Sequence, residues 1–169
     1  MAYLYHRVPV DMTGTILYPL NELKKYHPHL FEIQARKYAG REYLAEERIP
    51  LWPDCKWNDV IFMSAIHPAQ FRREWESVNK PLPRYNSYKF KLTDLDPSRL
   101  GVFFYKGNAR HFEPLKEADL PEYAVIREHT KDYWREKRDS KQPAFLFYKV
   151  PHILYYGTLD AQRAAVVWG

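Results

Sequence analysis

Polar side chains that could bind or position a ligand lie at the ends or bends of apolar runs, where a rigid scaffold can present chemistry. These residues are His6, Arg7, Asn58, Asp59, Ser64, Asn108 and His152. Imidazole, guanidinium, amide and hydroxyl groups that converge on one concave surface are typical of a binding site. The sequence therefore predicts one cleft at an edge of a β-sheet, with these side chains around it.

Two histidines are central to this prediction. His6 belongs to the alternating run Tyr3–Val8, which Pro9 ends, and His152 follows Pro151. Proline has no N–H for a sheet ladder and disfavours helix at the residue before it, so regular pairing should stop at both prolines. We expect His6 and His152 to share one site, which would bring the two ends of the chain together. The alternative is that each is a structural histidine.

The usual sequence signatures of catalytic and metal sites are missing. The phosphate-binding patterns GxxxxGK[ST] and GxGxxG do not occur, and neither do HExxH or GxSxG. Cys55 is the single cysteine, which excludes an intramolecular disulfide and a cysteine-based metal site. His27 and His29 are two residues apart, so in a helix they point to different faces and make a poor metal pair. We expect no metal site.

The pattern of apolar residues predicts one α+β domain over residues 1–169, with a mixed sheet of about six strands flanked by about four helices. Short aromatic and β-branched runs between turn residues indicate the strands. The expected strands are Tyr3–Val8, Val60–Ser64, Tyr85–Leu92, Gly101–Tyr105, Phe145–Val150 and Ile153–Tyr156. The last two runs flank Pro151, and both are expected to be buried.

Helices are predicted where apolar side chains recur at three- and four-residue spacing. A short helix opened by Pro19 lies within 11–25, a longer one runs from His27 to about Arg48, and two more span 67–79 and 122–139. Gly40 interrupts the longer helix, and a glycine inside a helix costs about 1 kcal/mol relative to alanine. We therefore expect a bend near Gly40 that presents Arg41 on a loop.

Composition limits the class of protein. No apolar run approaches the ~20 residues of a membrane span, and the N-terminus lacks the apolar region of a signal peptide. Together with the single cysteine, these features predict a cytoplasmic protein that does not engage membranes. The formal net charge of +5 permits a polyanionic partner without requiring one.

A basic segment with tyrosines among its charges is a candidate nucleic-acid surface. Its acidic residues are Glu74 and Glu76, and its basic residues outnumber them. The residues expected to contact nucleic acid are Arg72, Arg73, Arg84, Tyr85, Lys89 and Lys91, with Lys80 and Tyr88 among them. Cationic groups pair with phosphates, and aromatic rings stack on bases. The alternative is an ordinary exposed helix and strand.

The order of several segments resembles that of the DNA-targeting ADP-ribosyltransferase toxins. Tyr5-His6, a turn and Ile16-Leu17 resemble the opening of that family, and a basic helix holding Arg41 precedes an apolar strand at Val60–Met63. Residues 103–109, Phe-Phe-Tyr-Lys-Gly-Asn-Ala, are similar to the family's Phe-Thr-Asp-Gly-Asn-Ala turn. Residues 141–146, Lys-Gln-Pro-Ala-Phe-Leu, are similar to its Gln-Ala-Glu-Phe-Leu strand, and Pro151 matches the proline that follows it.

The resemblance implies an ADP-ribosyltransferase-like α+β fold, NAD as a substrate, a nucleic acid as the acceptor and a neutralising protein partner. It also implies roles for the polar residues at the predicted cleft. The expected NAD-binding residues are His6, Arg7, Asn58 and Ser64, and the expected catalytic residues are Arg41 and His152.

One departure from the family concerns its catalytic carboxylate. The family's catalytic glutamate precedes the Phe-Leu pair, and this chain has Ala144 at that position. The glutamate activates the acceptor and stabilises the cationic ribose as nicotinamide leaves, and a methyl group can do neither. The chain is then an inactive or engineered variant, a relative with different chemistry, or a protein outside the family. The competing hypothesis is a non-catalytic module that binds nucleic acid or protein through a basic, aromatic surface.

Overall fold

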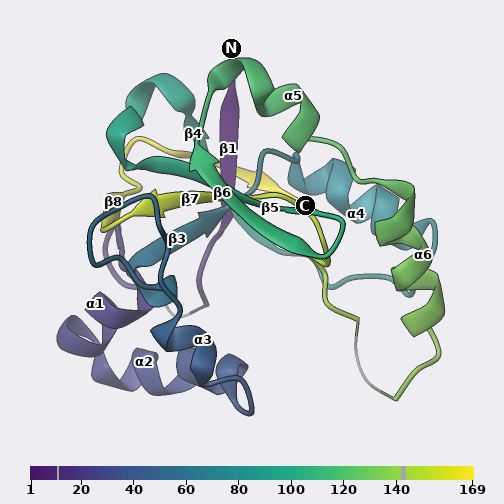
Figure 1. Ribbon diagram of the computed structural model, residues 1–169, viewed down its shortest axis with the longest axis horizontal. Coiled ribbons are helices and arrows are strands. Elements are labelled where there is room, and N and C mark those ends of the chain that lie inside the picture. Colours follow the sequence, from purple (N-terminus) through teal and green to yellow (C-terminus); the bar gives the residue numbers. More distant parts are fainter. Residues whose placement is uncertain (11, 142–143) are drawn as a thin grey trace.

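Nine strands and six α-helices form an α+β architecture in the computed structural model, which describes residues 1–10, 12–141 and 144–169. The predicted fold class is confirmed. The strands form three sheets instead of one, and every pair within them is antiparallel, so the expected mixed sheet is wrong. Figure 1 shows α1, α2 and α3 gathered below one side of the sheets, with α4 and α6 on the other side.

The largest sheet has four strands in the order β3-β7-β5-β6. Their bounds are Val60–Met63 for β3, His152–Tyr156 for β7, Leu100–Lys106 for β5 and Ala109–Pro114 for β6. β5 and β6 form a hairpin at Gly107, whose φ of +62° suits glycine. β6 was not expected from the sequence.

A second sheet joins both ends of the chain in the order β1-β4-β9. β1 is Tyr3–Arg7, β4 is Asn86–Lys91 and β9 is Ala165–Trp168. A short two-stranded sheet pairs β2, Ile16–Leu17, with β8, Leu159–Asp160. The strands β2, β8 and β9 were not predicted, because two to four residues carry too little periodicity to be recognised.

The backbones of Tyr5 and Ser64 connect the two larger sheets. Each residue donates its N–H to the carbonyl oxygen of the other, and both N···O distances are 2.8 Å. The main core lies between the sheets, where Leu4 and Phe90 belong to the same buried cluster as Val102 and Ile153. β1 therefore lies against β3, and this contact builds the cavity described below.

The opposite face of the β3-β7-β5-β6 sheet is also covered. Val60, Phe103 and Leu154 pack there with Ile49 and Cys55. Because both faces of the sheet are buried at β3, β5 and β7, these three strands are largely continuous apolar runs in the sequence, whereas the edge strand β6 is more polar and more exposed.

The first three helices confirm the predicted break. α1 is Leu20–Tyr26, α2 is Pro28–Ala35 and α3 is Tyr43–Glu46, with a 3₁₀ turn at 36–38. Gly40 has a φ of +76°, a conformation that favours glycine and ends the long helix expected over 27–48.

Two of the other helices, α4 and α6, pack together beside the sheets (Figure 1), whereas α5 packs into the main core through Leu120 and Tyr123. α4 is Pro68–Glu76, α5 is Leu120–Tyr123 and α6 is Glu128–Lys137. His67 caps α4, since its Nδ1 accepts the Ala69 N–H at 3.1 Å. The single helix expected over 122–139 is divided, because the chain leaves helical geometry between α5 and α6. Further 3₁₀ turns lie at 57–59, 92–94, 97–99 and 117–119.

The expected strand Phe145–Val150 is wrong. Residues 146–149 form turns, and Phe145 and Phe147 are 56% and 38% exposed. β7 already has β3 and β5 as neighbours, so no free edge beside it remains for this run. Val150 and Leu146 instead pack on α4 and α6. Asp11, Gln142 and Pro143, which belong to the expected turn and strand boundaries, lie outside the described residues.

None of the helices in the described ranges has both the length and the apolar character needed to cross a membrane.

Candidate functional site

A cavity of about 440 Å³ lies between β1, β3 and the α1–α2 pair. Most of the side chains that line it are apolar, among them Met12, Leu17, Leu20, Leu23, Leu30, Val60, Ile61 and Phe62. The polar residues on its wall are His6, Arg7, Thr13, His27, Gln34, Lys37 and Asn58, and no Asp or Glu of the described ranges is among the lining residues. An apolar cavity of this size with a few polar groups is typical of a small-molecule site.

His6 reaches the cavity because β1 is held against β3. Its Nδ1 lies 2.8 Å from the carbonyl oxygen of Phe62, and since a carbonyl can only accept, Nδ1 carries the proton and donates. Burial lowers the pKa of His6 below 6.5, the Phe62 hydrogen bond opposes that shift, and the charge of Lys37 adds to it. The ring is therefore neutral at pH 7, and its Nε2 is a hydrogen-bond acceptor.

Asn58 lies in the 3₁₀ turn that precedes β3. Hydrogen bonds of the residues on either side of it, Trp57 and Asp59, hold that turn in place. The Trp57 N–H donates to the Glu47 carbonyl at 2.8 Å, and the Gly157 N–H donates to the Asp59 carbonyl at 3.1 Å. The Asp59 carboxylate also accepts the Lys56 N–H at 2.8 Å. These bonds fix the backbone of Asn58, which places its side chain against the cavity.

The side-chain oxygen of Asn58 is the most unusual polar atom of the site. Asn58 is only 5% exposed, and its Oδ1 is buried without a hydrogen-bond partner among the residues that the structure describes. A buried acceptor left unpaired costs about 1–3 kcal/mol. A ligand that donates a hydrogen bond to this oxygen would recover that free energy.

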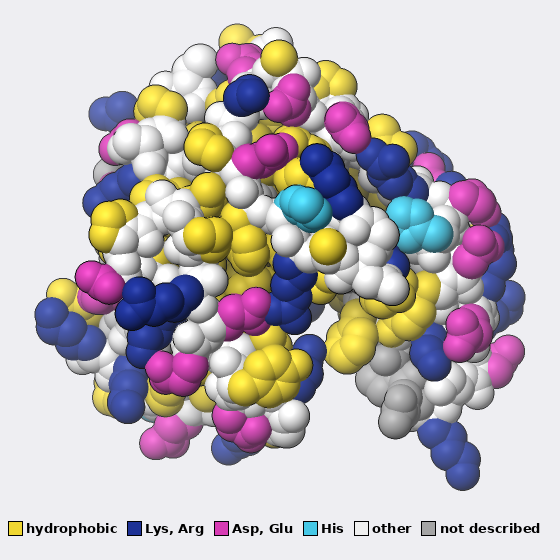
Figure 2. Space-filling view, viewed as in Figure 1, with side chains coloured by type: hydrophobic (Ala, Val, Ile, Leu, Met, Phe, Trp, Pro, Cys, Tyr) yellow, Lys and Arg dark blue, Asp and Glu magenta, His cyan; other side chains and the backbone are white. Residues whose placement is uncertain are grey.

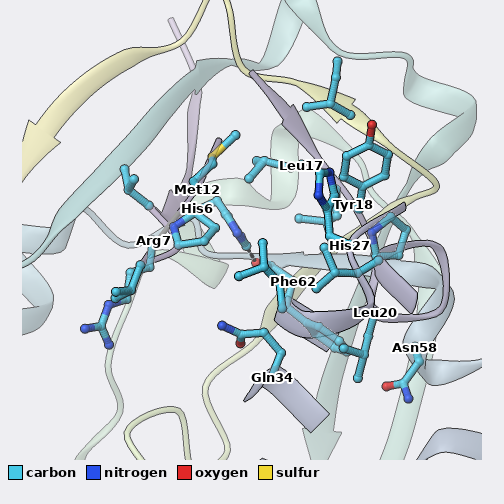
Figure 3. Close-up of a pocket in the computed structure, with 18 of the residues that line it drawn as sticks. His6, Arg7, Met12, Leu17, Tyr18, Leu20, His27, Gln34, Asn58 and Phe62 are labelled. Carbon is cyan, nitrogen blue, oxygen red and sulfur yellow. Dashed lines mark hydrogen bonds between the residues drawn. The ribbon is translucent and has the colours of Figure 1, made fainter. Parts of the chain in front are cut away.

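The two acceptors, His6 and Asn58, mark opposite ends of the cavity. Asn58 comes before β3, whereas His6 bonds to Phe62 within β3, so the two ends are on the order of 10 Å apart along the chain. Figure 3 shows His6 and Arg7 on one side and Asn58 with Leu20 on the other.

The His6 end of the cavity carries positive charge. Arg7 is exposed, with its guanidinium carbon 5.0 Å from the centre of the Tyr85 ring. The Lys37 ammonium is partly dehydrated by its surroundings, which lowers its pKa, and its charge acts on His6. The cavity is therefore cationic at one end and neutral at the other.

Three of the residues expected to bind NAD, His6, Arg7 and Asn58, line this one cavity. Ser64 does not line it. Its Oγ accepts the Ile66 N–H at 3.0 Å, and its backbone holds β1 in place. Lys37, Gln34 and Tyr38 also line the cavity and were not predicted, because nothing in the sequence distinguishes them from other residues of a helical segment.

The expected catalytic residues are not brought to the cavity. Arg41 donates to the Lys37 carbonyl at 2.8 Å, and its guanidinium carbon lies 5.1 Å from the centre of the Phe145 ring. His152 donates from Nδ1 to the Val150 carbonyl at 2.8 Å, and burial lowers its pKa to about 4. Neither side chain lines the cavity, so His6 and His152 do not share it.

His152 lies instead among three phenylalanine rings. The centre of its ring is 5.8 Å from that of Phe62, 5.7 Å from that of Phe103 and 5.6 Å from that of Phe147. Phe62 therefore contacts both histidines, His6 through its carbonyl and His152 through its ring.

The position expected for a catalytic glutamate is remote from the cavity. Ala144 is half-buried and packs against the cluster that includes Phe71, Trp134 and Val150. A carboxylate at this position would face α4 and α6. Cys55 is no substitute nucleophile, because burial raises the pKa of its thiol to about 12.

The expected nucleic-acid residues do not form one free surface. Arg72 is committed to the Glu76 carboxylate at 2.9 Å, the Gly169 carbonyl at 2.6 Å and the Leu82 carbonyl. Tyr88 packs against the core, and its hydroxyl lies 3.2 Å from the Met12 sulfur.

Within the same expected set, Tyr85 is half-buried beneath Arg7, and the Lys89 ammonium lies 3.9 Å from the centre of the Tyr3 ring. Arg73, Arg84 and Lys91 are exposed. Figure 2 shows basic and acidic side chains interspersed over the face in view, without a continuous basic stripe.

Comparisons of the chain with protein-family models, with curated proteins and with solved structures found no match. Within the described ranges, no group of three or more His, Cys, Asp or Glu side chains is arranged to hold a metal ion.

Proposed function

We propose that the protein binds a nucleotide in the cavity between β1 and β3, and that its ligand is NAD, held as in an ADP-ribosyltransferase-like site. The observation that carries the proposal is the polarity of the cavity. A cationic end with Arg7 and Lys37 and a neutral end with the unpaired oxygen of Asn58 are joined by apolar walls. A nucleotide matches this order of polarity, because it has an anionic phosphate at one end, a ribose in the middle and a flat ring that bears N–H donors at the other end.

Each part of such a ligand finds suitable chemistry in the cavity. Arg7 and Lys37 can pair with phosphate oxygens, as cationic side chains commonly do. The neutral ring of His6 offers Nε2 as an acceptor for a ribose hydroxyl. The apolar side chains between the ends, such as Leu20 and Phe62, suit the faces of a planar ring.

Binding of NAD and transfer of ADP-ribose are separate steps, and they are tested separately. ADP-ribosyl transfer needs a group that stabilises the cationic ribose as nicotinamide leaves. No carboxylate of the described residues lines the cavity, and Ala144 lies elsewhere. Release of free nicotinamide from NAD, with and without single-stranded oligonucleotides as acceptors, is the measurement that tests the transfer step.

Binding is tested by titrating the protein with NAD in a calorimeter. We expect saturable binding by the native chain and at least a tenfold loss of affinity in His6→Ala, because the variant removes the acceptor at the cationic end. His29→Ala is the matched control, since His29 is exposed and does not line the cavity. If the folded native chain does not bind millimolar NAD, or if both variants bind alike, the proposal fails. Oligonucleotide binding without NAD binding would favour the non-catalytic module.

A further inference from the structure

We infer that Asn58 makes the neutral end of the cavity specific for a heteroaromatic ring with an exocyclic NH₂ group, as in adenine or the carboxamide of nicotinamide. The corresponding oxo or acid analogue would be rejected. The inference rests on the proposed nucleotide site and adds to it a ligand class and the residue that selects that class.

The hydrogen-bonding capacity of Asn58 favours a ligand group that donates. A side-chain carbonyl oxygen only accepts, and this one is buried without a partner in the described part of the chain. An NH₂ group supplies a donor, whereas a keto oxygen or a carboxylate places a second acceptor against the first. Sites built to pair with a ligand N–H or O–H discriminate strongly against analogues that lack it, because the buried group is then left unpaired.

The turn that carries Asn58 is held rigidly. Trp57 and Asp59 are each tied by backbone hydrogen bonds, to Glu47 and Gly157 respectively. The Asn21 amide also donates to the Asp59 carboxylate at 2.7 Å. The backbone that carries Asn58 is therefore held in place before a ligand arrives, so binding does not have to order this turn.

The charges at one end of the cavity impose a direction on a bound nucleotide. Phosphate is drawn to the end with Arg7 and Lys37, which leaves the ring of the nucleotide for the end with Asn58. Figure 3 shows the Asn58 amide at the margin of the cavity on the side away from Arg7, with its oxygen turned toward the other lining side chains.

Two pairs of mononucleotides test the inference in a calorimeter. AMP against IMP differs in the amino group of a purine, and nicotinamide mononucleotide against nicotinic acid mononucleotide differs in the carboxamide. All four carry the same ribose phosphate for the His6 end. We expect the NH₂-bearing member of at least one pair to bind at least tenfold more tightly, and the pair that discriminates shows which ring the site takes.

Variants locate the source of that preference. Asn58→Leu keeps the approximate size of the side chain and removes the unpaired oxygen, so we expect it to fold and to bind both members of the pair alike. Gln34→Leu is the matched control, because Gln34 is another amide on the cavity wall, and it should keep the preference.

The outcomes separate this inference from the proposed function. Equal binding of both members of both pairs by the native chain overturns the specificity and leaves nucleotide binding intact. No binding of any of the four by the folded native chain overturns the specificity, and it overturns the proposed function as well if NAD also fails to bind. An Asn58→Leu variant that keeps the preference overturns the role of Asn58.

Discussion

His6 and His152 have the same local chemistry and different surroundings. Each donates its Nδ1–H to a backbone carbonyl at 2.8 Å, each has a pKa lowered by burial, and each contacts Phe62. His6 lines a cavity with other polar groups, whereas His152 lies among phenylalanine rings. A polar residue at the end of a strand therefore becomes part of a site only where empty volume and further polar groups adjoin it.

The largest effect on stability is expected in β7, the strand that begins at His152, because its central residues are buried in the core. Leu154 is completely buried in β7, and Leu154→Ala should lower the free energy of unfolding by about 2–5 kcal/mol. The change is measured by urea denaturation. A cost below about 1 kcal/mol would show that this side is not the tightly packed core described here.

The next largest effect is expected at low pH, where protonation of His152 should lower the stability of the fold. The folded chain keeps His152 unprotonated down to a pKa of about 4, whereas the unfolded chain binds that proton below the ordinary value of 6.5. Its contribution to stability is therefore complete above pH 6.5 and is lost as the pH falls toward 4, by at most about 3.4 kcal/mol at 1.36 kcal/mol per pKa unit.

Urea denaturation of the native chain and of His152→Leu at pH 7 and pH 4.5 isolates this contribution. The native chain should lose more stability between the two pH values than the variant does. Equal losses would mean that His152 is accessible to water and protonates freely in the folded protein.

His6→Ala should act on binding more than on stability. We expect a loss of NAD affinity of at least tenfold, which corresponds to about 1.4 kcal/mol, because the variant removes an acceptor from the cavity. The melting temperature should stay within a few degrees, since His6 is only half-buried. A large fall in melting temperature with unchanged NAD affinity would make His6 a structural histidine like His152.

The smallest effect is expected at Phe145, which the sequence alone places in a buried strand. The ring is 56% exposed and its described neighbours include the guanidinium of Arg41, so Phe145→Ala should cost less than about 1 kcal/mol. Thermal denaturation of Phe145→Ala and Leu154→Ala under the same conditions compares the two costs. A cost equal to that of Leu154→Ala would contradict the exposed turn at 146–149.

Local sequence patterns were sufficient for much of the fold. The expected strands Val60–Ser64 and Ile153–Tyr156, which the structure forms as β3 and β7, and the break near Gly40 follow from side-chain periodicity and backbone preference, which act within a few residues. The α+β class follows from the same patterns.

Strand pairing and the commitments of charged side chains depended on contacts that the sequence does not reveal. Phe145–Val150 has the composition of a strand, yet both neighbours of β7 are already in place. Arg72 appears free in the sequence, yet carbonyl groups of Leu82 and Gly169 occupy its guanidinium. Competition for a sheet edge or for a hydrogen-bond donor is settled between residues distant in the chain, so a local pattern cannot report it.

The candidate site divides in the same way. Residue type and position at strand ends were enough to select His6, Arg7 and Asn58 from the sequence. Only the tertiary structure joins them, because the Tyr5–Ser64 bridge brings β1 against β3 and the α1–α2 pair closes the cavity. The sequence contains groups that can bind a ligand, whereas the burial of the Asn58 oxygen without a partner in the described residues and the cavity that Asn58 lines exist only once distant segments have packed together.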